Sequence, residues 1–182
     1  MKIEELAIEI ELPEGVTAEI AGHAIKVKGP KGETERKLAS SKVSIENNDN
    51  KIIIKSKNAT KREKTTTGTF KAHIQNMITG VTEGHTYRLK ICSGHFPMNV
   101  AVSGNELSVS NFLGEKIARK LNIKEGAQVK VEGDDVIVES ISKETAGQTA
   151  ADIETLTRIK GRDKRIFQDG IYITEKDGKS IE

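Results

Sequence analysis

The sequence predicts an α+β protein made of two similar two-layer domains, each a mainly antiparallel sheet packed on one helix. Two internal echoes indicate a duplication: residues 14–27 recur at 125–138 with an offset of 111, and residues 66–74 recur at 145–153 with an offset of 79. The length of 182 residues also fits two domains of about ninety residues each.

The first half has the pattern of strands followed by one helix. Apolar residues at every second position predict a strand over residues 7–12. Alternating or β-branched runs between turn residues predict four more strands, at 16–20, 24–28, 43–46 and 51–55. Glycine, proline and asparagine mark the turns 21–23, 29–32 and 47–50. From residue 58 to 79 apolar residues are three or four apart, which predicts a helix.

The second half also contains strands and one closing helix. The same patterns predict strands at 87–91, 100–102, 106–110, 129–131 and 136–139, and a helix over 146–159. The prediction for residues 111–122 is ambiguous. Leu113, Ile117 and Leu121 have helical spacing, whereas the repeat aligns Leu121 with a strand.

The repeat also predicts how the two domains are ordered. In the first copy a strand pair (43–46 and 51–55) lies between the repeated hairpin and the helix. In the second copy the matching pair (100–102 and 106–110) lies before the repeated hairpin. We therefore expect the two domains to hold the same elements in a different chain order. Two glycines without periodicity over 80–84 mark the boundary. The expected divisions are an N-terminal domain at 1–80, a C-terminal domain at 84–174 and a C-terminal tail at 175–182.

Composition limits the class of protein. Lys and Arg exceed Asp and Glu by only two, so the overall charge is not that of a typical nucleic-acid binder. A single cysteine excludes an internal disulfide framework and fits a reducing compartment. The acidic N-terminus does not read as a secretory signal, and no run is long enough for a membrane span. These features predict a cytoplasmic protein without a membrane partner.

The charges are nevertheless sorted along the chain. Residues 158–165 hold five cations and one anion, and residues 55–71 hold six cations and one anion, whereas residues 1–14 carry a net charge of −4. Lys and Arg neutralise phosphates, and Arg can bind two phosphate oxygens at once. The clusters therefore predict polyanion contacts, with a helix C-terminus favoured by its dipole and a solvated charged face as the alternatives.

No constellation for catalysis is visible. Cys92 and His95 lie close together with His85 upstream, but zinc sites usually take four ligands in close pairs. A Cys–His nucleophile pair lacks an orienting third group, and the other histidines, His23 and His73, are scattered. We therefore expect no enzyme, no cofactor, no metal and no small-molecule substrate.

Four segments are distinctive: VKGPKGE at 27–33, SGHFPMNV at 93–100, NFLGEK at 111–116 and IKGRDKRIFQDGIY at 159–172. Together they resemble the family of the sixth protein of the large ribosomal subunit, in its archaeal and eukaryotic branch. The resemblance implies two similar α+β domains and a non-enzymatic protein of the cytoplasmic ribosome. It also implies binding to large-subunit rRNA near the sarcin–ricin loop and the stalk base, beside neighbouring ribosomal proteins.

The resemblance and the charge clusters together name the candidate RNA-binding residues. The C-terminal basic segment supplies most of them: Arg158, Lys160, Arg162, Lys164, Arg165 and Phe167. Weaker candidates are Lys28, Lys31, Lys61, Arg62, Lys64, His95 and Phe96. For His95 and Phe96, stacking on an unpaired base and anchoring of the loop both remain open; Ile166 and Phe167 are expected to pin the basic segment to the second helix. The alternative function is a free-standing protein- or RNA-docking module of two β-rich domains.

Overall fold

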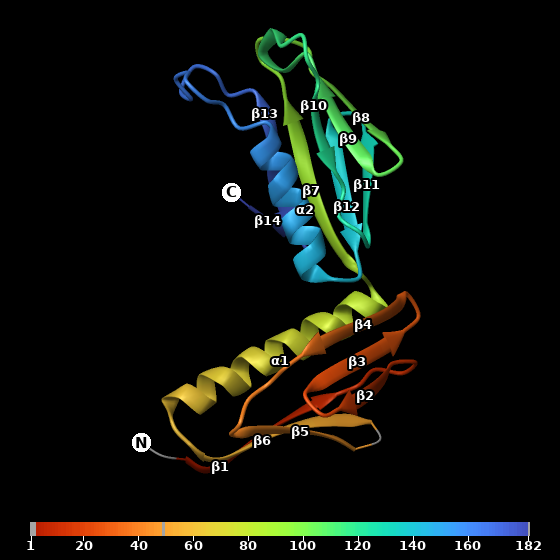
Figure 1. The fold of residues 1–182 in the computed structure, drawn as a ribbon, viewed down its shortest axis with the longest axis vertical. Coiled ribbons are helices and arrows are strands. Elements are labelled where there is room, and N and C mark those ends of the chain that lie inside the picture. The colour runs from red at the N-terminus through yellow and green to blue at the C-terminus, as the bar shows by residue number, and fades with distance from the viewer. Residues whose placement is uncertain (1–2, 49, 182) are drawn as a thin grey trace. The chain divides into compact units, whose positions relative to one another are not determined.

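The chain forms two compact units, residues 1–84 and 85–182. Their fold is given by a computed structural model that describes residues 3–48 and 50–181. Figure 1 shows that each unit contains one helix lying against strands.

Unit 1 places two small antiparallel sheets around a long helix. Its elements are β1 (Ile3–Glu11), β2 (Thr17–Ala21), β3 (Ala24–Gly29), β4 (Gly32–Lys37), β5 (Val43–Asn48), β6 (Lys51–Ala59) and α1 (Lys61–Thr82). The strand orders are β1-β6-β5 and β2-β3-β4. Alternate residues of β3 and β6 are buried, among them Val27, Ile52 and Ile54. Both strands contact α1, whose apolar residues Ile74 and Val81 are also buried.

Unit 2 repeats this plan with a larger sheet. Its elements are β7 (His85–Cys92), β8 (Asn99–Ser103), β9 (Glu106–Ser110), the 3-10 turn η1 (Phe112–Gly114), β10 (Arg119–Asn122), β11 (Ala127–Glu132), β12 (Asp135–Ser140), α2 (Lys143–Leu156), β13 (Gly170–Lys176) and β14 (Lys179–Ser180). The strand orders are β10-β9-β8 and β11-β12-β7-β13-β14. Leu89, Leu107, Val138, Ile153 and Ile171 are fully buried in one core.

The two units have the same chain order, which confirms the duplicated α+β fold. Each has one long strand, a three-stranded meander, a hairpin and a helix, and the long strand pairs with the second strand of the hairpin, as β1–β6 and β7–β12. The prediction of a different chain order is therefore wrong. The repeat at an offset of 111 residues predicts the wrong order because it aligns β2–β3, in the small sheet of unit 1, with β11–β12, in the large sheet of unit 2. Any two-stranded hairpin carries the same local pattern.

Several predicted boundaries also move. α1 continues to Thr82, so most of the expected 80–84 boundary is helical. α2 begins three residues earlier than expected because the Ser142 hydroxyl caps it, accepting a hydrogen bond from the Thr145 amide at 3.3 Å. The ambiguous segment 111–122 forms η1 and then β10. Residue 175, where the tail was expected to begin, lies inside β13, which pairs with β14.

Neither helix in the part of the chain that the structure describes combines the length and apolar character that crossing a bilayer requires.

Candidate nucleic-acid interface

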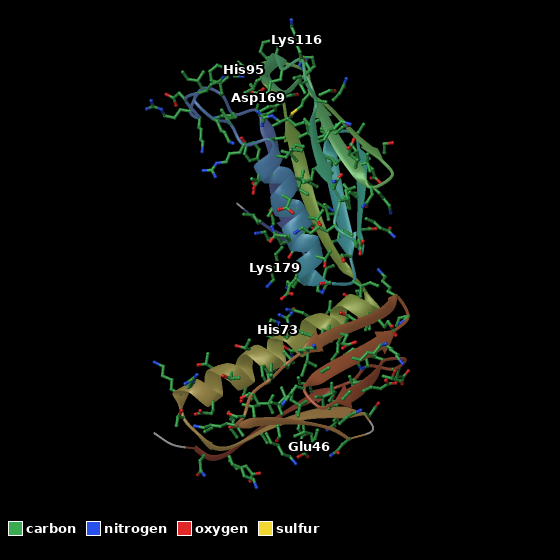
Figure 2. The ribbon with its side chains drawn as sticks, viewed as in Figure 1. Glu46, His73, His95, Lys116, Asp169 and Lys179 are labelled. Atoms are coloured by element: carbon green, nitrogen blue, oxygen red, sulfur yellow. The ribbon has the colours of Figure 1, made fainter. Side chains whose placement is uncertain are left out.

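Three loops meet at one end of unit 2. Cys92 at the end of β7 pairs with Gly170 at the start of β13, so loop 93–98 and loop 157–169 leave the sheet side by side. Val109 pairs with Arg119, which brings the η1 loop to the same end. Figure 2 shows His95, Asp169 and Lys116 gathered there, away from Lys179. Antiparallel pairing therefore collects residues that are far apart in sequence.

A buried carboxylate joins two of these loops. One oxygen of Asp169, Oδ1, accepts hydrogen bonds from the backbone amides of Gly94 at 2.7 Å and His95 at 2.9 Å. The other oxygen, Oδ2, lies 2.6 Å from Nδ1 of the His95 ring. Asp169 is only 3% exposed. Its charge is therefore satisfied by three donors on a single neighbouring loop, and we call this arrangement the Asp169 clamp.

The pKa of Asp169 reflects two opposing effects. Burial disfavours the charged carboxylate and acts to raise the pKa, and it is the largest single influence. The hydrogen bonds from His95 and Gly94, together with the attraction of the imidazole, outweigh burial and hold the pKa of Asp169 below its ordinary value. The clamp is thus made with an ionised carboxylate at neutral pH.

An aromatic stack extends the clamp into the basic segment. The His95 ring stacks on Phe167, with centroids 4.7 Å apart and planes inclined by 29°. The guanidinium of Arg162 lies 4.9 Å from the centroid of the same Phe167 ring. These contacts favour the loop-anchoring interpretation of His95. A Cβ added at Gly114 would lie 3.7 Å from the ring of Phe96, which remains 44% exposed.

The basic segment is held at its ends and open along its length. Ile159 is buried after α2, and Phe167 is half-buried against His95. Ile166 is 64% exposed, so the expectation that it pins the segment is wrong. The candidate cations of this segment are all exposed: Arg158, Lys160, Arg162, Lys164 and Arg165.

One of these cations has a partner within the segment. Arg165 forks onto Asp163, with Nη2 at 2.7 Å from Oδ2, and the backbone amide of Arg165 also binds that carboxylate. The hydrogen bonds from Arg165 lower the pKa of Asp163 below its ordinary value. Asp163, the anion of the segment, therefore stabilises the local conformation of the loop.

Arg119 was not identified from the sequence. Its guanidinium binds both carboxylate oxygens of Glu115, at 2.9 and 2.6 Å, and lies 4.3 Å from the centroid of the Phe112 ring. Nη1 also donates to the carbonyl of Leu156 at 2.7 Å. Arg119 thus ties the η1 loop to the end of α2. The Glu115–Arg119 spacing of four residues was a visible signal, but the contact with α2 was not.

The candidates of unit 1 fall into two separate groups. Lys61, Arg62 and Lys64 are exposed on the first turn of α1, whereas Lys28 and Lys31 lie near its last turn. A 22-residue helix is about 33 Å long, so the two groups do not form one patch.

These two groups also differ in their partners. Lys28 forms an ion pair with Glu19 at 3.1 Å, and the Lys31 ammonium donates to the carbonyl of Glu83. The cations on the first turn of α1 instead lie at the positive end of the helix dipole, where a cation is electrostatically unfavourable. Their position there is not explained by helix stability.

The fold and this loop cluster define a class of protein: a tandem pair of α+β domains with a cationic loop surface at one end of the second domain. Residues 12–84 and 96–170 match the family model described as ribosomal protein L6. The chain is 48% identical over 178 residues to the large ribosomal subunit protein uL6 of Sulfurisphaera tokodaii, covering 97% of this chain and 96% of that one. It is 47% identical over 173 residues to the uL6 protein of Methanococcus vannielii, covering 95% of each.

The chain therefore belongs to the ribosomal protein L6 family. Proteins of this family are structural rather than enzymatic. The two matched segments correspond to the two units, which agrees with the duplicated fold.

Proposed function

We propose that this chain is a structural constituent of the large ribosomal subunit that binds rRNA through the basic segment 158–165. The observation that carries the proposal is a run of five exposed cations on a loop whose C-terminal end is anchored by the Asp169 clamp and the Phe167 stack. Lys and Arg supply the phosphate contacts that dominate affinity for nucleic acid. The proposed position near the sarcin–ricin loop and the stalk base is supported only by the family resemblance.

A rigid loop suits recognition by shape. Phosphate contacts position a protein on RNA without reading its sequence, and double-stranded RNA is recognised largely through shape and backbone contacts. A loop that is ordered before binding loses less conformational entropy when it meets a fixed array of phosphates. The clamp and the stack supply this order without using the cations of Lys160 and Lys164.

Unit 1 offers a second, smaller RNA contact on the first turn of α1. Lys61, Arg62 and Lys64 are exposed there, and the carboxylate among them, Glu63, is buried and turned back to the helix start. The surface of this turn is therefore cationic, although the sequence places a glutamate within it.

The outer strand faces of unit 1 are poor candidates for an RNA contact. Their charges are paired across strands: Lys26–Glu33 at 2.9 Å, Lys51–Glu11 at 3.2 Å and Lys55–Glu46 at 2.7 Å. A surface that neutralises itself attracts phosphates weakly. We assign these faces to solvent or to adjacent ribosomal proteins rather than to rRNA.

The test is the affinity for a large-subunit rRNA fragment that contains the sarcin–ricin stem-loop, measured across a salt series. Changing Arg158, Lys160, Arg162 and Lys164 to Ala is expected to weaken binding and to reduce the slope of log affinity against log salt by about three, at roughly 0.7–0.9 per lost phosphate contact. A matched control changes four paired cations of the strand faces to Ala: Lys26, Lys28, Lys51 and Lys55.

The control should leave both affinity and slope nearly unchanged. Equal losses in the two variants would mean that general charge, not the basic segment, drives binding. An unchanged slope in the segment variant would refute the assignment of phosphate contacts to residues 158–164. A fragment without the stem-loop should bind more weakly, and equal binding would refute the proposed location.

A further inference from the structure

A shallow recess of about 650 Å³ lies beside the basic segment in unit 2. Ser93 and His95 line it from the loop after β7, and Lys164, Ile166 and Gln168 line it from the loop before β13. Tyr172 closes it from the first residues of β13. Small-molecule sites have volumes of about 300–1,000 Å³, so the recess can hold one nucleotide.

The base of this recess is rigid. The backbone of Gly94 and His95 is fixed by the Asp169 clamp, and Asp169 itself lines the recess. Figure 2 shows His95 and Asp169 close together. Gly170 allows the phenol group of Tyr172 to pack closely, because a Cβ at residue 170 would lie 3.1 Å from both Cζ and the hydroxyl oxygen of Tyr172. The recess therefore has a preformed shape.

The walls combine apolar, polar and cationic groups. Tyr172 is 41% exposed and Ile166 is 64% exposed, although large apolar side chains usually pack inward. Lys164 lines both this recess and a second recess beside the C-terminal end of α2, so it is a cation at the edge of the site. The amide nitrogen of Gln168 donates to the carbonyl of Arg165 at 3.4 Å, which holds the side chain across the loop.

We infer that this recess receives one unpaired base of the bound RNA, packed against Tyr172 and Ile166, with the adjoining phosphate on Lys164. Bases that leave a helix are commonly stacked on aromatic side chains, and such stacking tolerates any base. The surrounding cations raise the local concentration of RNA strands. The inference rests on the proposed rRNA binding and adds a single-stranded contact to the phosphate contacts described above.

Photo-crosslinking tests the inference directly. A single-stranded oligouridylate that carries one 5-iodouridine is bound to the full-length chain and irradiated, and the crosslinked residue is identified by mass spectrometry. The expected product is a crosslink at Tyr172. Affinity is measured in parallel for the oligouridylate and for a fully paired RNA duplex.

The variants separate the stack from the phosphate contacts. Tyr172→Leu is expected to weaken binding of the oligouridylate about tenfold and to leave duplex binding unchanged. Tyr172→Phe keeps the ring and should retain the affinity of the native chain. Ile117→Ala is the control, because Ile117 is a large, exposed apolar residue of unit 2 that does not line the recess, and the change should have no effect.

The outcomes distinguish this inference from the proposed function. Duplex binding that depends on the basic segment, together with crosslinks at Phe96 or elsewhere and no effect of Tyr172→Leu, would overturn the recess and leave the rRNA contact intact. Equal weakening of duplex and single-strand binding by Tyr172→Leu would also overturn it, since the change would then act on the loop as a whole. A native chain that binds neither RNA would overturn both proposals.

Discussion

Replacing Asp169 with Ala tests how strongly the clamp stabilises unit 2. The change removes the acceptor for the amides of Gly94 and His95 and for the His95 ring, three hydrogen bonds to a charged group. Each such bond contributes about 1.5–3 kcal/mol, or roughly 4.5–9 kcal/mol in total. Gly94 and His95 are exposed, however, so water can replace the acceptor, and the burial cost of the carboxylate is also removed. We expect a net loss of about 3 kcal/mol in the free energy of unfolding.

Urea denaturation followed by tyrosine fluorescence measures this loss in the full-length chain. Both tyrosines of the sequence, Tyr87 and Tyr172, lie in unit 2, and there is no tryptophan, so the signal reports that unit alone. With a slope of about 1–3 kcal/mol per molar urea, the midpoint should fall by roughly 1–3 M. Asp163→Ala is the control, since its carboxylate is exposed and binds Arg165 on the surface.

The result can contradict the reasoning in two ways. A loss below about 0.5 kcal/mol is typical of a surface substitution and would mean that the carboxylate does not hold the loop. An equal loss in Asp163→Ala would mean that any carboxylate in this segment has the same effect. Because the pKa of Asp169 is lowered in the folded chain, its contribution should be complete above its ordinary pKa of 3.8 and be lost as the pH falls through the folded value.

Further predictions concern unit 1, whose unfolding can be followed by circular dichroism. Hydrogen bonds from Thr60 lower the pKa of Glu63 to about 2, so its stabilisation should be complete above pH 4.5 and disappear as the pH falls toward 2; Glu63→Gln should abolish this acid-dependent part. Gly29→Ala would place a Cβ 2.8 Å from the Val81 side chain and should destabilise the unit by about 1–3 kcal/mol. Gly68→Ala, in open space on α1, should instead stabilise it by about 0.5–1 kcal/mol.

Local patterns were sufficient for most of the elements of the fold. Alternation over residues 7–12 reflects the two-sided geometry of a strand, and the spacing of Phe70, Ile74 and Met77 reflects the 3.6-residue turn of a helix. These periodicities depend on neighbouring residues, so they can be recognised without knowing which strands pair. Partner choice is different, because a hairpin has the same pattern in a three-stranded or a five-stranded sheet, and the two units were therefore matched in the wrong order.

The same distinction separates the candidate site residues. The cations of residues 158–165 stand out by composition alone, and so do those at the start of α1. Lys28 and Lys31 look equivalent in the sequence, yet each has a partner within the fold, at Glu19 and at the carbonyl of Glu83. Whether a lysine is available to an RNA phosphate depends on which carboxylates or carbonyls the chain places beside it.

By itself the sequence determined that this protein has a duplicated α+β plan and a cationic segment after its second helix, because strand and helix periods and local charge are properties of neighbouring residues. Only the tertiary structure decided that the end of this segment is anchored to a distant loop. Asp169 reaches Gly94 across 75 residues, and Phe167 meets His95 because β7 and β13 pair at the Cys92–Gly170 step. Such contacts depend on strand pairing, whose energy comes from the packed core of the whole unit and not from any single segment of the chain.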